Sequence, residues 1–334
     1  MLTEEELNRD VESSMVFSAD GRTLELVDDS TLTFCKIPYG VWRIEDNAFA
    51  GCSELKMVII PDTVVTIGEG AFTGCKKLDC IVLPESVEEI GEDCFSGCDR
   101  LRNIAVDGNN PYFKDIYGVL FSKDEKAIIK FPSASNAHTC YGIPEGVDFI
   151  FSGAFINCSF LEAIWIPQSI TYISDSAFCD CQNLENVYFP AGLKSIGEFA
   201  FANCRKLESL SLPDSLESIG EFAFTGCNSL RSVVLPQSLS RLHTEAFSHC
   251  ENLRTVRIRS EVRLIESRIF VDCWNMRDIY IEVEDPSCIE MESDGDQNYL
   301  MDVVTLHVPE DSMQLYLEHP YFCSFFKIVA IDKE

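Results

Sequence analysis

The chain of 334 residues contains sixteen cysteines, whose thiols can form disulfides or bind metal ions. That number indicates a disulfide framework, a metal protein or a compartment that keeps thiols reduced. Seven of the cysteines have no metal-ligand spacing and lie outside the regular set described in the next sentence: Cys35, Cys80, Cys94, Cys140, Cys179, Cys288 and Cys323. Nine recur every 23 residues, with one interval of 60: Cys52, Cys75, Cys98, Cys158, Cys181, Cys204, Cys227, Cys250 and Cys273. Their register predicts a column of buried thiols that act as small apolar groups. Disulfides between neighbours in the column are the alternative, since their Cα atoms could lie close enough.

Other candidate chemistry is sparse. His243 and His249 flank Glu245, but H-T-E-A-F-S-H lacks the i, i+4 spacing that places two imidazoles on one metal. The acidic residues 290–298 (EMESDGDQN) do not follow the ligand order of an EF-hand, which favours a solvated loop. No nucleophile elbow, Walker or dinucleotide-binding motif occurs. We therefore expect no enzyme, no cofactor and no metal site.

The cysteine spacing belongs to a 23-residue repeat. Its general form is L-x-x-V-x-I-P-x-S-V-x-x-I-G-x-x-A-F-x-x-C-x-x-L, and residues 207–230 (LESLSLPDSLESIGEFAFTGCNSL) are one copy. The alternation in V-x-I predicts a strand, and proline ends it because it cannot donate to a β-ladder. Glycine permits a turn, and A-F-x-x-C predicts a short helical turn. One unit cannot bury its apolar face alone, so we expect stacked units with strands about 4.8 Å apart in a parallel sheet.

These units resemble the leucine-rich repeats of the BspA-like family over about residues 17–281. The resemblance implies an α/β fold class, a right-handed leucine-rich repeat solenoid (horseshoe) with a parallel sheet on its concave face. Short helical turns or coil are expected elsewhere, with small caps at both ends. Residues 303–331 are similar to the closing segment of these proteins, a strand, a short helix and a final strand. The resemblance also implies binding of host extracellular proteins such as fibronectin and fibrinogen.

The repeats predict one elongated domain over residues 1–334. We expect an N-terminal cap at 1–37, repeats at 38–283 and a C-terminal cap at 284–334. The interval of 60 holds a hairpin-bearing variant unit at about 107–143, because F-S-K-D at 121–124 repeats the F-S-A-D found at 17–20. A terminal unit must differ from the others, since its outer face has no neighbour to bury it.

In such a solenoid, the residue between the inward apolar positions of each strand faces the concave surface. The ligand-binding residues that we predict there are Trp165, Tyr188, Val234, Arg257, Tyr280 and Arg254. Trp165 and Tyr188 are typical interface anchors, and the alternative is that they only pack on their neighbours or on the inserted hairpin. A local basic patch suits an acidic peptide or glycan, or offsets the acidic tail; its members are Arg231, Arg254, Arg257, Arg259, Arg263 and Arg277.

The net charge of −29 argues against nucleic acid as a partner, because the phosphate backbone would be repelled. No apolar run approaches the ~18 residues of a membrane helix, so we expect no membrane insertion. The start, MLTEEELNRDV, lacks the features of a secretory signal and predicts a cytoplasmic chain. The family role would instead place a longer form at the cell surface or outside the cell.

We therefore expect a monomeric, non-catalytic protein of the adhesion type that binds a protein or glycoprotein ligand through its concave sheet. The alternative is an intracellular scaffold or regulatory interaction protein, which free thiols and the missing signal favour.

Overall fold

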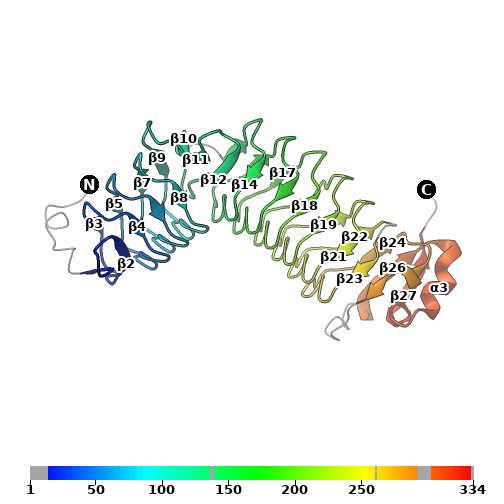
Figure 1. Ribbon diagram of the computed structural model, residues 1–334. Helices are drawn as coiled ribbons and strands as arrows, with labels where there is room; N and C mark the ends of the chain where they lie inside the picture. Colours follow the sequence, from blue (N-terminus) through cyan, green and yellow to red (C-terminus); the bar gives the residue numbers. More distant parts are fainter. Residues whose placement is uncertain (1–13, 136–138, 260–261, 292–301, 332–334) are drawn as a thin grey trace. The chain divides into compact units, whose positions relative to one another are not determined.

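The computed structural model describes residues 14–135, 139–259, 262–291 and 302–331 (Figure 1). The chain forms two compact units, which are described separately below. Unit 1 comprises residues 1–138 and 146–160, and unit 2 comprises residues 139–145 and 161–334. The single domain predicted for residues 1–334 stays a prediction.

Most regular coils in the described part of the chain have two short strands. The first strand comes from the V-x-I segment, as in β5 (Met57–Ile59), where Val58 is buried and its two neighbours are exposed. The second comes from the segment before the glycine, as in β6 (Thr66–Ile67). Equivalent strands of successive coils pair in parallel at the repeat spacing, so that Ile67 is the register partner of Ile90. The predicted solenoid of parallel strands is confirmed, and it is mostly β-structure.

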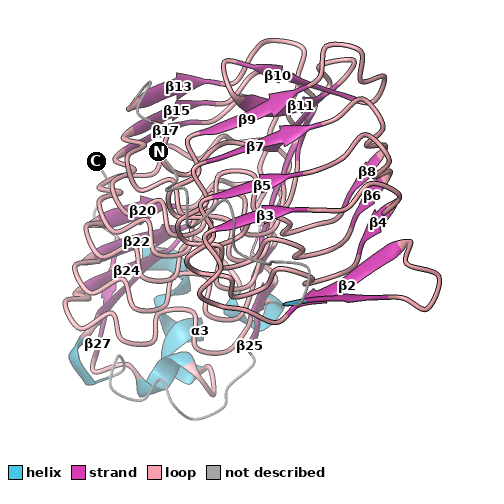
Figure 2. Ribbon diagram, turned by 90° about the vertical axis from the view of Figure 1, so that its left-hand side faces the viewer, coloured by secondary structure: helices cyan, strands magenta, loops and turns pink. Residues whose placement is uncertain are grey.

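In the described part of unit 1, the first strands pair as β3 with β5 and β7 with β9 (Figure 2). Beside β5, they are β3 (Phe34–Lys36), β7 (Cys80–Leu83) and β9 (Asn103–Val106). A second sheet has the order β1-β2-β4-β6-β8. Beside β6, its strands are β1 (Met15–Phe17), β2 (Thr23–Val27), β4 (Arg43–Ile44) and β8 (Glu89–Ile90). A third sheet follows the order β10-β11-β12-β14. Its strands are β10 (Phe113–Ile116), β11 (Val119–Ser122), β12 (Ala127–Lys130) and β14 (Phe149–Ile150).

Two antiparallel hairpins of unit 1 have the same turn. In the turn between β1 and β2, the Ser18 hydroxyl donates to Asp20 Oδ1 at 2.7 Å. In the turn between β11 and β12, the Ser122 hydroxyl donates to Asp124 Oδ1, also at 2.7 Å. Each aspartate also accepts a backbone N–H two residues later. The F-S-x-D segments therefore form the same hydrogen-bonded turn in both places.

Unit 2 repeats the same pattern over more coils. Its first strands are β13 (Cys140–Gly142), β15 (Ala163–Trp165), β17 (Asn186–Tyr188), β20 (Ser232–Val234), β22 (Thr255–Ile258), β24 (Asp278–Ile281), β26 (Thr305–Val308) and β27 (Lys327–Ala330). Its second strands are β16 (Tyr172–Ile173), β18 (Ser195–Ile196), β19 (Ser218–Ile219), β21 (Arg241–Leu242), β23 (Leu264–Ile265) and β25 (Glu290–Met291). The closing segment contains η2 (Pro286–Cys288), η3 (Glu310–Ser312), α3 (Met313–Glu318) and η4 (Phe322–Ser324). The strand, short helix and final strand predicted for residues 303–331 are thus β26, α3 and β27.

The core consists of columns of identical side chains from successive coils. In unit 2 the column phenylalanines stack with ring centroids 5.0 to 6.2 Å apart, from Phe178 to Phe270. The nine column cysteines are all buried, and all sixteen cysteines are free thiols. The A-F-x-x-C segments are turns rather than helices, because a left-handed residue such as Asn203 precedes each cysteine. The predicted column of buried thiols is confirmed.

The glycine of the I-G segment is required by close packing between coils. A Cβ built on Gly68 would lie 2.5 Å from the backbone nitrogen of Asp46 in the preceding coil. The residue with a positive φ angle lies two positions after the glycine of the I-G segment. It is Gly70 in the coil of Gly68, and Phe222 in the coil of Gly220. The sequence therefore identified the glycine correctly, but its role is to let two coils approach rather than to form the turn.

Candidate ligand-binding surface

All six residues predicted to bind a ligand lie in unit 2, on or next to its first strands. Trp165 in β15 and Tyr188 in β17 are register partners on adjacent parallel strands. Their rings stack with centroids 4.8 Å apart and an angle of 6° between the planes. They remain 44% and 48% exposed, so each ring keeps a face or edge for another molecule. The stack holds both side chains in place before any ligand binds.

The first strands of unit 2 do not form one continuous sheet. Residues 209–211 are not a strand, and they separate the sheet β13-β15-β17 from the sheet β20-β22-β24-β26-β27. Leu210 and Leu212, which point inward in the repeat, are only half-buried there. The aromatic pair and the remaining predicted residues therefore lie on two separate sheets of this unit.

The second sheet places Val234, Arg257 and Tyr280 in one row across three neighbouring strands. Val234 is exposed. The Arg257 guanidinium lies 4.7 Å from the centroid of the Tyr280 ring, which is a cation–π distance. It also forms an ion pair of 2.6 Å with Glu282. Arg257 is therefore held and neutralised within the protein, and it is a positioned planar group rather than a free cation.

The same row continues to a residue that the sequence did not indicate. His307 in β26 is the register partner of Tyr280, and their rings stack with centroids 4.1 Å apart. The His307 Nε2 atom lies 2.8 Å from Asp278 Oδ1. The interval from Tyr280 to His307 is 27 residues instead of 23, so the repeat spacing alone could not locate it.

Arg254 directly precedes β22 and lies outside the row that contains Arg257. Together with Arg231 it lines a depression of about 240 Å³, which Glu208, Ser229 and Asn252 complete. Both arginines are exposed, and neither forms an ion pair with another residue of the described ranges. The lining is almost wholly polar, so this depression suits a polar or anionic group better than an apolar one.

Among the described residues, the other candidate groups do not converge on a reaction centre. His243 and His249 each pair with a carboxylate of the following coil, Glu266 at 3.2 Å and Asp272 at 3.1 Å. Within the part of the chain that the structure describes, no group of three or more His, Cys, Asp or Glu side chains could hold a metal ion. Residues 292–298 of the acidic stretch lie outside the described residues. No helix in the described ranges is both long and apolar enough to cross a membrane.

The chain matches the model of the BspA type leucine rich repeat region in six copies, over residues 27–143 and 148–277. It therefore belongs to this family of leucine-rich repeat proteins. A search among curated proteins finds no match.

Three solved structures illustrate what the chain is similar to. The pneumococcal vaccine antigen PcpA is 23% identical with a TM-score of 0.62, over 90% of this chain and 68% of the antigen, and it supports the fold alone. A leucine rich cell surface protein from Faecalibacterium prausnitzii is 29% identical with a TM-score of 0.58, over 79% of this chain and 60% of that protein. A leucine-rich repeat protein from Bacteroides ovatus is 25% identical with a TM-score of 0.57, over 88% and 80% of the two chains.

Proposed function

We propose that this protein is a non-catalytic binding protein of the cell-surface type, which engages a protein or glycoprotein through the first strands of unit 2. The observation that carries the proposal is the exposed stack of Trp165 on Tyr188. Stacking fixes both side chains in the free protein, so little conformational entropy is lost when a partner covers them. Large aromatic rings in this state are the usual centres of binding energy in protein interfaces.

The second sheet supplies a different kind of contact to the same partner. Val234 is apolar and exposed, while Arg257, Tyr280 and His307 present fixed planar groups. Beside them, Arg231 and Arg254 offer guanidinium groups that match carboxylate oxygens. A surface with aromatic anchors and a polar border favours a folded protein or its glycan over a small metabolite. The similarity to a bacterial cell surface protein supports this class of function.

The experiment compares two double variants. A partner recovered with the intact chain is purified, and its affinity is measured by biolayer interferometry for wild type, Trp165→Ala/Tyr188→Ala and Trp42→Ala/Tyr39→Ala. The second pair is the matched control, since Tyr39 and Trp42 are exposed aromatic residues of unit 1. We expect a loss of at least about 30-fold for the first variant and less than about 3-fold for the control. Unchanged affinity in a Trp165→Ala/Tyr188→Ala protein with wild-type circular dichroism would refute the proposal.

An intracellular scaffold of the same fold is the second candidate. The observation that favours it is the set of sixteen free thiols, which is typical of proteins in a reducing compartment. Thiol counting on protein isolated from its native compartment distinguishes the two, because a surface protein would have oxidised at least its exposed thiols, Cys140, Cys288 and Cys323.

A further inference from the structure

The regular stacking of unit 1 is interrupted between two of its sheets. The strand β8 pairs with β6 on one side, and it is the last strand of its sheet. The second strand of the next coil, β12, pairs instead with β11 and β14. The inserted hairpin β10–β11 pairs with β12 on the side opposite to β14 and packs against β9, so that β12 does not join β8. An edge strand such as β8 presents backbone N–H and C=O groups to any extended chain that lies beside it.

The turn that follows β12 is also shorter than the equivalent turn of the preceding coil. Ile128 and Phe131 are three residues apart, whereas Ile90 and Phe95 in the preceding coil are five apart. Because the turn after β12 has two residues fewer, the equivalent turns of the preceding and the following coil approach each other. The Asp93 carboxylate lies 2.9 Å from the point where a Cβ on Gly153 would be.

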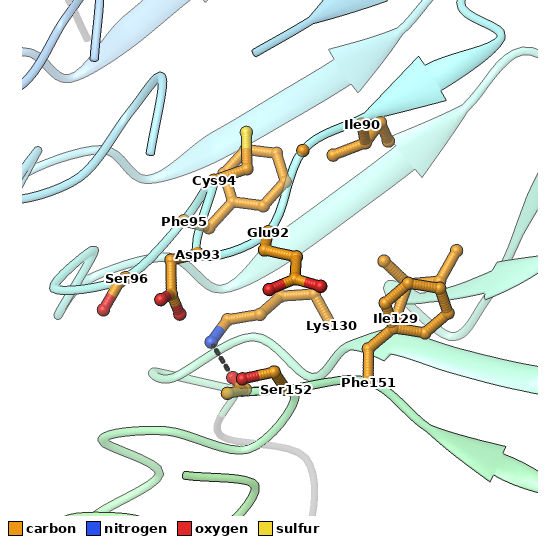
Figure 3. Close-up of a pocket in the computed structure, with 12 residues that line it drawn as sticks. Ile90, Glu92, Asp93, Cys94, Phe95, Ser96, Ile129, Lys130, Phe151 and Ser152 are labelled. Carbon is orange, nitrogen blue, oxygen red and sulfur yellow. Dashed lines mark hydrogen bonds between the residues drawn. The ribbon is translucent and has the colours of Figure 1, made fainter. Parts of the chain in front are cut away.

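Lys130 occupies the position of the missing turn. Its side chain is buried, and its Nζ donates to the carbonyl oxygen of Gly153 at 2.9 Å. Figure 3 shows the lysine passing between Glu92 and Ser152 toward this carbonyl. A cavity of about 20 Å³ remains here, which is enough for one water molecule.

A larger cleft of about 470 Å³ continues from this point along β4, β6 and β8. It shares Ile90, Ile129 and Phe151 with the small cavity, and Phe113 completes its apolar wall. Ile90, Ile129 and Phe151 are half-buried, so their outer faces remain available to a ligand. The cleft therefore has an apolar floor, unlike the polar depression in unit 2.

The border of the cleft is strongly acidic. Four exposed carboxylates belong to its lining: Asp46, Glu69, Glu88 and Glu89. The one cation among the lining residues described is Arg43, which is already 3.0 Å from Glu45 and 3.5 Å from Asp46. These carboxylates would repel an anionic ligand. A purely apolar ligand would remove water from the carboxylates without supplying a charge to pair with them, which is unfavourable.

We propose that this cleft binds an extended peptide segment in which an arginine or lysine adjoins an apolar residue. The apolar side chain packs on Ile129 and Phe151, the cation pairs with Glu88 and Glu89, and the peptide backbone pairs with the free edge of β8. This site lies in unit 1 and is independent of the surface proposed above in unit 2. Failure of one proposal leaves the other unaffected.

The test uses the full chain and a fluorescein-labelled decapeptide of alternating arginine and leucine, with binding measured by fluorescence anisotropy. Two double variants are compared with wild type: Glu88→Gln/Glu89→Gln, and Glu198→Gln/Glu221→Gln as the control. Both remove two exposed negative charges, but the control residues lie in unit 2. We expect at least a tenfold loss of affinity in the first variant and less than a twofold change in the control. Equal losses in the two variants overturn the proposal, because they indicate attraction to the net charge alone.

The apolar floor is tested separately. A decapeptide of alternating arginine and glycine should bind at least tenfold more weakly than the arginine–leucine peptide, and equal binding overturns the proposal. Thr66→Phe places a ring in the cleft from the half-buried face of β6. We expect this variant to keep its circular dichroism spectrum and to lose the peptide, whereas wild-type affinity in a folded Thr66→Phe protein contradicts the site.

Discussion

The thiol of Cys227 lies 3.4 Å from the carbonyl oxygen of Phe201, which is 26 residues earlier in the preceding coil. The same contact, at 3.2 or 3.3 Å, recurs in both units for Cys75, Cys98, Cys204, Cys250 and Cys273. Cysteine is a small apolar side chain that can still donate one weak hydrogen bond. It therefore fills the column between phenylalanine and leucine and also contacts a backbone carbonyl of the neighbouring coil.

Replacement of Cys227 by alanine should lower the free energy of unfolding of the protein. The change removes the S–H donor and leaves a small void at a position with no solvent exposure, so we expect a loss of about 1–2 kcal/mol. Urea denaturation followed by circular dichroism gives the value. The control is Cys323→Ala at an exposed position, where we expect a change within about 0.5 kcal/mol. Equal stability of the two variants would show that the column contact contributes nothing.

The column also predicts how stability depends on pH. Burial raises the pKa of Cys52 to about 11 and the pKa values of Cys227 and Cys273 to about 12, from the ordinary value of 9.0. Between pH 9 and these values, the unfolded chain has lost thiol protons that the folded chain retains. The free energy of unfolding should therefore be insensitive to these thiols below pH 9 and should fall as the pH rises above 9.

The measurement is the urea midpoint at intervals from pH 7 to 10.5. Cys227→Ala has one buried thiol fewer, so its midpoint should decrease less steeply above pH 9 than that of wild type. Since lysine and tyrosine titrate in the same range, the difference between the two proteins is the informative quantity. Parallel curves would mean that Cys227 ionises as easily in the folded chain as in the unfolded one.

Lys130 is expected to stabilise unit 1 mainly through its aliphatic stem. Lys130→Ala should cost about 2–5 kcal/mol, because it empties a buried volume in the shortened coil. Lys130→Met should cost less than half of that, since methionine keeps most of the stem and removes a buried charge that was itself costly to desolvate. Both values come from urea denaturation. Lys126→Ala, at an exposed position four residues earlier, is the control and should change stability by less than about 0.5 kcal/mol. If the Met variant is as unstable as the Ala variant, the polar contacts of the ammonium group, which include the hydrogen bond to Gly153, dominate instead.

Much of the fold could be predicted because one spacing determines it. The 23-residue interval located the strand pairing of Trp165 with Tyr188 and of Arg257 with Tyr280, both of which the structure has in register. The prediction of strand partners failed where the spacing differs from 23 residues. His307 is 27 residues from Tyr280, and no periodic pattern could assign it to the same row.

Two further differences arise from packing that a repeat pattern does not describe. Residues 209–211 match the strand pattern, but serine at the two outward positions provides little cross-strand contact, and no strand forms there. The cleft of unit 1 depends on the two residues missing before Phe131 and on the position of the inserted hairpin. The sequence indicated the insertion but not the surface that it creates.

The column of thiols has a consequence for the lifetime of the protein. Nine side chains that are inaccessible in the folded chain become reactive together when it unfolds, at regular intervals along the sequence. In an oxidising solution, random disulfides would then form before the coils could stack again. Unfolding would become irreversible under such conditions, so the survival of the protein would depend on its unfolding rate rather than on its equilibrium stability.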